Sequence, residues 1–120
     1  MKAIILAFEA PGGFARRADK AQYKAYMDGW YAFGDALQEA GVFRGGAALQ
    51  SPQTATVIRI ANGRRSVEDG PFTDSKEQLG GYFLVEVASL DEAAELSRKC
   101  PAAKDGRVDV RAIPDYGNGE

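Results

Sequence analysis

The chain has 120 residues, a length that suits one compact domain over residues 1–120. Its 15 basic and 17 acidic side chains give a net charge of −2, which argues against nucleic acid as a partner, and the apolar run 3–8 is too short for a membrane span or a secretory signal. One cysteine, Cys100, excludes an intramolecular disulfide and favours a cytoplasmic location, while the absence of histidine removes the commonest general base and metal ligand.

Residues 2–9 (KAIILAFE) predict a central strand, because apolar residues occupy both of its faces. Pro11, Gly12 and Gly13 end this strand. We interpret the two arginines that follow, Arg16 and Arg17, as solvated charges of a loop.

A long helix is predicted next, with Asp19 as its N-cap in capping-box spacing with Gln22 and Gly41 as its C′ residue. Apolar and small residues recur along it at steps of three and four: Tyr23, Tyr26, Met27, Trp30, Phe33, Gly34 and Leu37. Glycine inside a helix costs about 1 kcal/mol relative to alanine, so we interpret Gly34 as a point of close packing against the sheet.

A short strand is expected over residues 42–49, followed by a hairpin whose strands are residues 54–60 and 65–68. Asn62 and Gly63 form the turn, because a type I′ turn needs positive φ at both central positions. The sequence DGPF (residues 69–72) then breaks the strand.

Residues 73–79 predict one helical turn, and Gly80–Gly81 a bend that releases the chain into a strand over 82–87 (YFLVEV). Ser89 and Glu92 form a capping box for a second helix, which Pro101 stops. Residues 107–113 are the last strand, and the tail from residue 114 is polar.

Without the hairpin, the order is strand, helix, strand, strand, helix, strand. We therefore predict an α+β, ferredoxin-like βαββαβ fold, in which an antiparallel sheet carries both helices on one face and the hairpin is an insertion. Phe83, Val85 and Val87, with 108, 110 and 112, are expected to face the helices. The opposite face then carries Tyr82, Leu84 and Ile113 beside Glu86, Asp109 and Arg111, and a second copy of the chain is its expected cover, as in dimeric α/β barrels.

The stretch 67–87 (VEDGPFTDSKEQLGGYFLVEV) resembles the YCII-related, DGPF-type family. The resemblance continues through 90–93, 100–103 and 108–111, and upstream it includes 40–42 and 45–46. It implies a dimeric ferredoxin-like fold of undefined activity. Some relatives are proposed to use a His–Asp pair, which this chain cannot form because it has no histidine. The resemblance places Trp30 in the corresponding stretch of the first helix. Neighbouring genes of such proteins imply a link to extracytoplasmic-function sigma factors.

One candidate ligand site surrounds the DGPF turn, with residues of both charge signs and aromatic residues close in sequence. Its members are Asp69, Phe72, Lys76, Glu77 and Tyr82, with Trp30 from the first helix. The alternative is structural: Asp-Gly-Pro is turn chemistry, Phe72 can fill the core, and most lysines are solvated.

A second candidate is the dimer seam, where Leu84, Glu86, Asp109 and Arg111 share a face. A carboxylate pair with an arginine can bind a polar molecule, or it can form an interfacial salt-bridge network. Two functions follow: a homodimer that binds a small polar molecule near the DGPF loop and the seam, or a non-catalytic interaction module. No metal or cofactor is predicted, and neither a reaction nor catalytic residues can be assigned.

Overall fold

The computed structural model describes residues 1–69 and 77–115, and for residues 66–69 it describes the backbone. Four strands form one antiparallel sheet: β1 (Lys2–Glu9), β2 (Phe43–Ala48), β5 (Gln78–Glu86) and β6 (Arg107–Ala112). They lie in the order β2-β5-β1-β6, so β1 pairs with both β5 and β6. This order of strands confirms the ferredoxin-like prediction.

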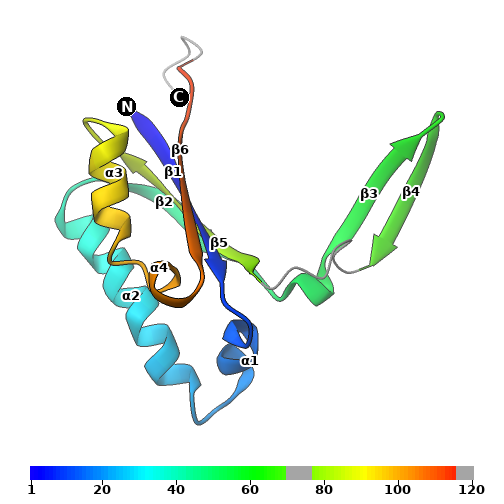
Figure 1. Cartoon of the computed structure of the whole chain (residues 1–120), viewed down its shortest axis with the longest axis horizontal. Coiled ribbons are helices and arrows are strands. Elements are labelled where there is room, and N and C mark those ends of the chain that lie inside the picture. Colours follow the sequence, from blue (N-terminus) through cyan, green and yellow to red (C-terminus); the bar gives the residue numbers. More distant parts are fainter. Residues whose placement is uncertain (70–76, 116–120) are drawn as a thin grey trace.

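The longest helix, α2 (Tyr23–Glu39), and α3 (Leu90–Ser97) lie on the same face of this sheet (Figure 1). Shorter helical segments complete the connections: α1 (Gly13–Ala18), η1 (Pro52–Thr54) and α4 (Ala102–Asp105). The predicted cap of α3 by Ser89 is confirmed, since Ser89 Oγ accepts a hydrogen bond from the Glu92 amide at 3.2 Å. The Glu92 side chain accepts from the Ala88 amide at 3.2 Å rather than from that of Ser89. Gly41, with φ of 75°, follows α2 as predicted.

The core lies between these helices and the sheet. Alternation along β1 buries Ala3, Ile5 and Ala7 completely. From α2, Phe33 and Leu37 pack into the same layer. The Phe33 ring meets that of Phe83 edge to face with centroids 4.9 Å apart. Val85 and Val87 are buried, and Val108 and Val110 pack against this core, so the predicted assignment of the helix-facing side is confirmed.

The other face of the sheet, which we call the bare face, carries none of the helices formed by the described residues (Figure 1). Its centre is apolar, because Ile4 pairs with Leu84 and Leu6 with Tyr82 across β1 and β5. All four are partly exposed.

The hairpin of β3 (Thr56–Ala61) and β4 (Arg64–Asp69) is a separate two-stranded sheet. Its turn is the predicted one, with φ of 52° at Asn62 and 75° at Gly63. The hairpin extends away from the main sheet on the side opposite α2 and α3 (Figure 1).

Three local expectations differ from the structure. The segment that was expected to be a loop contains α1, and α2 begins after Gln22 rather than after Asp19. Asp19 instead closes the preceding turn, where its Oδ1 accepts a hydrogen bond from the Ala21 amide at 2.8 Å. Strand β5 begins at Gln78, so Gly80 and Gly81 lie inside a strand and do not form a bend before it. Most of the predicted helical turn at 73–79 falls outside the described residues.

Candidate functional site

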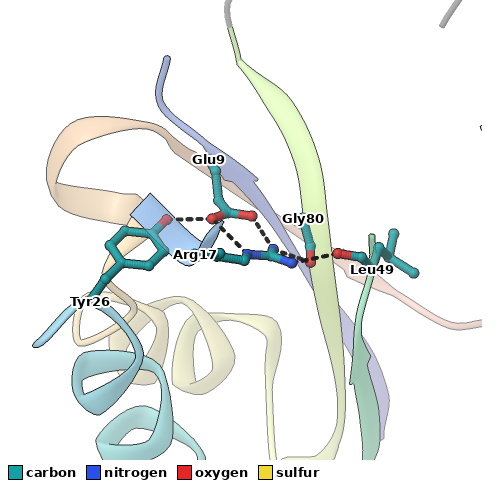
Figure 2. A network of polar contacts seen from close by, with 5 residues as sticks. All are labelled: Glu9, Arg17, Tyr26, Leu49 and Gly80. Atoms are coloured by element: carbon teal, nitrogen blue, oxygen red, sulfur yellow. Dashed lines mark hydrogen bonds and ion pairs between the residues drawn. The ribbon is translucent and has the colours of Figure 1, made fainter. Parts of the chain in front are cut away.

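A buried ion pair joins the end of β1 to helix α1. The Glu9 side chain is fully buried, and both of its oxygens accept hydrogen bonds from the Arg17 guanidinium, one from Nη2 and one from Nε at 3.3 Å (Figure 2). Arg17 also donates from Nη1 to the Leu49 carbonyl oxygen at 2.5 Å and from Nη2 to the Gly80 carbonyl oxygen at 2.9 Å. One guanidinium therefore connects α1, β1, β5 and the end of β2. The expectation that Arg17 is a solvated loop charge is wrong.

Tyr26, in the first turns of α2, completes this network by donating its hydroxyl hydrogen to Glu9 Oε1 (Figure 2). Burial, followed by the hydrogen bond and the negative charge of Glu9, raises the pKa of Tyr26 to about 12. The Arg16 guanidinium lies over the Tyr26 ring, 4.5 Å from its centroid. The hydroxyl is therefore held neutral, as a donor to the carboxylate.

Two glycines make room for the ion pair. In β5, Gly80 sits at a shift of register, because Ala7 pairs with Gly81 and Phe8 pairs with Leu79. A Cβ atom at Gly80 would lie 2.7 Å from Glu9 Cδ and 2.8 Å from Arg17 Nη2, too close for either. A Cβ atom at Gly13 would lie 2.8 Å from the Tyr26 hydroxyl oxygen. The glycines therefore allow the charged groups to approach the backbone.

Next to Arg17 lies a cavity of about 410 Å³ between α2 and the β2–β5 half of the sheet. Its lining is mainly apolar: Met27, Trp30 and Gly34 come from α2, Phe43, Gly46, Ala47 and Ala48 from β2, and Gly80, Gly81 and Phe83 from β5. Tyr31, Asp35 and Gln38 border it with exposed side chains. A largely apolar hollow with a few polar groups at its border is typical of sites for small molecules.

Gly34 is not explained by a packing partner among the described residues. A Cβ atom built there would meet none of their heavy atoms within 4 Å, so the expectation of close packing against the sheet is wrong. The glycine costs the helix about 1 kcal/mol relative to alanine. What its missing side chain leaves is open space in the wall of the cavity.

Trp30 lies between the cavity and the ion-pair network. Its ring meets that of Tyr26 at 62° with centroids 6.3 Å apart. The indole Nε1 is buried, and among the described residues it makes no hydrogen bond of normal geometry. The nearby indole N–H nevertheless favours the ionised Tyr26 hydroxyl, and so opposes part of the rise in the Tyr26 pKa.

A second hollow of about 450 Å³ lies on the other side of the network, beside α4. Three of the four charged residues in its lining are already paired, since Arg16 Nη2 lies 3.5 Å from Asp105 Oδ2 and Glu9 is held by Arg17; the fourth is Lys104. Most of the charged groups around this hollow are therefore already engaged within the protein and are not available to bind a ligand.

Of the described side chains predicted around the DGPF turn, only Trp30 lines the cavity between α2 and the β2–β5 half of the sheet. Tyr82 lies on the bare face, and Glu77 Oε1 lies 3.6 Å from Arg107 Nη1 at the start of β6. Asp69 is described by its backbone alone, at the end of β4, while Phe72 and Lys76 lie outside the described residues.

The structure does not gather the predicted seam residues into one cluster. Glu86 and Leu84 lie on β5, whereas Asp109 and Arg111 lie on β6, with β1 between the two strands. Glu86 Oε2 lies 2.6 Å from the Met1 ammonium, and the hydrogen bond from this group lowers the pKa of Glu86. Asp109 Oδ1 accepts a hydrogen bond from Arg107 Nε at 3.1 Å.

Sequence reasoning missed Glu9 and Arg17, although one signal was present. The period of two that buries Ala3, Ile5 and Ala7 also directs Glu9 toward the helices. A buried carboxylate needs a cationic partner, and the nearest arginines in sequence are Arg16 and Arg17. This reasoning would have indicated the pair, though not which of the two arginines forms it.

Among residues 1–69 and 77–115, no group of three or more acidic or cysteine side chains is placed to hold a metal ion. In the same part of the chain, no helix has the length and apolar character needed to cross a membrane.

Cys100 is 2% exposed, and burial raises the pKa of its thiol to about 11. Because the thiolate is the reactive form, we expect alkylation by iodoacetamide at pH 8 to be about 100-fold slower in the folded protein than in guanidinium chloride. Mass spectrometry of timed samples measures both rates. Equal rates would show that the Cys100 thiol is accessible and that its pKa is not raised in the folded protein.

The fold and the apolar cavity define a ferredoxin-like α+β protein with space for a small molecule. Residues 1–116 match the YCII-related domain, and the chain belongs to this family. It is 39% identical over 84 residues to an uncharacterised protein of Rhizobium meliloti (strain 1021), an alignment that covers 68% of each chain.

Among solved structures, the chain is similar to the 5-chloro-2-hydroxyhydroquinone dehydrochlorinase TftG of Burkholderia phenoliruptrix, in complex with 2,5-dihydroxybenzoquinone. The TM-score is 0.54 with 100% of both chains covered, and the identity is 19%. This likeness supports the fold alone.

Proposed function

We propose that the protein binds a small, flat, largely apolar molecule in the cavity between α2 and the β2–β5 half of the sheet. The observation that carries the proposal is Gly34, an unfavourable residue in the middle of a helix that faces open space. A ligand is a physical reason to keep that space empty. The cavity lies on the helix side of the sheet, away from the bare face where the dimer seam was predicted.

The dimensions and the chemistry of the cavity support this class of ligand. A volume of about 410 Å³ lies in the usual range for small-molecule sites, roughly 300–1,000 Å³. The aromatic rings of Trp30, Phe43 and Phe83 favour a flat apolar body, and the exposed Asp35 and Gln38 can meet polar substituents at the border. The structural neighbour TftG was solved with a flat quinone of this size class.

The substitution Gly34→Leu tests the proposal, because its side chain would enter the cavity without a clash at Cβ. We expect 2,5-dihydroxybenzoquinone to change the emission of Trp30, the only tryptophan, in a saturable way in the wild type. The same titration of Gly34→Leu should show at least a tenfold weaker response, after correction for absorption by the probe.

Ala32→Leu is the matched control, because it adds the same side chain to an exposed position of α2. Its titration should equal that of the wild type. If Gly34→Leu folds normally and responds as the wild type does, the cavity is not the binding site.

We also propose that the chain forms a homodimer through the bare face. Its apolar centre of Ile4, Leu6, Tyr82 and Leu84 is partly exposed, and a second copy of the same surface would cover it by two-fold symmetry.

A further inference from the structure

We infer that the β3–β4 hairpin, which we call the arm, is a dimerisation arm that contacts the second copy of the chain beside the bare face. This inference rests on the proposed dimer and adds to it a surface outside the main sheet.

The arm has two of the most exposed large apolar side chains described. Ile58 is 60% exposed and Ile60 is 73% exposed, and as alternate residues of β3 they share one face of the hairpin. Exposed apolar residues side by side on one element are typical of a contact surface.

The arm also has little support from the other residues that the structure describes. Within residues 1–69 and 77–115 its strands pair only with each other, and contacts with other elements are sparse. An isolated two-stranded hairpin is marginally stable in water, so another surface is expected to stabilise it. Three arginines on the arm, Arg59, Arg64 and Arg65, keep it soluble before assembly.

The position of the arm identifies its partner surface. It projects on the same side of the sheet as the bare face (Figure 1). A second copy of the chain that packs on the bare face therefore lies next to the arm. By two-fold symmetry, the arm of each copy contacts the other copy.

The area of the interface supports a second copy as the occupant. The four strands of the bare face have six to nine residues each, and a rise of about 3.3 Å and a spacing of about 4.8 Å give this face a footprint of roughly 460 Å². Two such faces bury roughly 900 Å² in total, below the roughly 1,200 Å² at the low end of stable interfaces. Each arm of two six-residue strands has a footprint of roughly 190 Å² and covers an equal area of the partner. Two arms therefore raise the total to roughly 1,700 Å², within the usual range of a specific interface.

Sedimentation velocity over a range of micromolar concentrations tests the inference with four chains. The wild type is expected to have twice the 12.9 kDa mass of one chain. The double variant Ile58→Asp/Ile60→Asp should raise the dissociation constant about 100-fold or more, and Leu84→Asp, on the bare face, should also dissociate the dimer. Leu90→Asp, at a 40% exposed position on α3, should remain as tight a dimer as the wild type.

The outcomes separate the two proposals. A wild type that is monomeric at every concentration overturns the dimer and the arm together. A double variant that dimerises as tightly as the wild type, while Leu84→Asp dissociates, overturns the arm alone and leaves the dimer through the bare face.

Hydrogen exchange of the wild type gives an independent reading that needs no substitution in the arm. Amides of residues 56–61 are expected to exchange faster when the protein is diluted below the dissociation constant. Exchange there that is independent of concentration, in a protein that does dimerise, would also overturn the arm.

Discussion

The substitution Glu9→Ala is expected to lower the free energy of unfolding by about 3–5 kcal/mol, because it leaves the Arg17 guanidinium without its counter-charge. The Arg17 side chain is only 19% exposed, so water replaces the lost carboxylate poorly. Loss of the acceptor for the Tyr26 hydroxyl adds to the cost. Urea denaturation followed by circular dichroism measures the change, provided that the slope of the transition is unchanged.

Glu95→Ala is the control for this prediction. Glu95 pairs with Arg98 at 3.1 Å, but both side chains are more than 70% exposed, and such pairs contribute about 0–1 kcal/mol. A loss in Glu9→Ala no larger than the loss in Glu95→Ala would show that the buried pair does not stabilise the fold. Replacing both partners, as Glu9→Leu/Arg17→Met, is expected to cost less than Glu9→Ala, because no unpaired charge remains.

The second large effect is expected from Gly80→Ala, which places a methyl group where Glu9 and Arg17 meet. The ion pair must separate or the strand must move, and overpacking of this kind costs about 1–3 kcal/mol. Since a broken buried pair adds to this, we expect a loss near the top of that range, measured by the same urea titrations.

Gly34→Ala is the matched control, with the opposite sign. The new methyl group meets no heavy atom of the described residues within 4 Å, and alanine is favoured over glycine in a helix by about 1 kcal/mol. We therefore expect Gly34→Ala to be more stable than the wild type. Equal effects of the two substitutions would contradict the different roles we give these glycines.

Much of the fold could be predicted from local patterns. Alternation in residues 82–87 and 107–113 identified the buried side of each strand, and Asn62–Gly63 identified the hairpin turn. The order of the elements then indicated the topology of the sheet, because few arrangements satisfy short, right-handed connections.

The candidate site was less predictable, because it depends on contacts between distant segments. Arg17 meets Leu49 and Gly80, which are 32 and 63 residues away in the chain. A glycine that makes room for an ion pair, such as Gly80, has the same sequence signal as a glycine in a bend. Gly34 was interpreted from the sequence as a packing contact, and only the surrounding space shows that it belongs to an open wall.

The most direct test of the proposed binding site uses the side-chain N–H signal of Trp30, which is unique in a ¹⁵N–¹H spectrum because the chain has one tryptophan. Phenol, benzoate and hydroquinone serve as flat probes in separate titrations. We predict saturable shifts of the Trp30 indole signal and of the backbone amides of residues 46–48 and 80–81. The proposed binding site would be contradicted if the probes shift only signals of other residues, or if they leave every signal unchanged up to millimolar concentration.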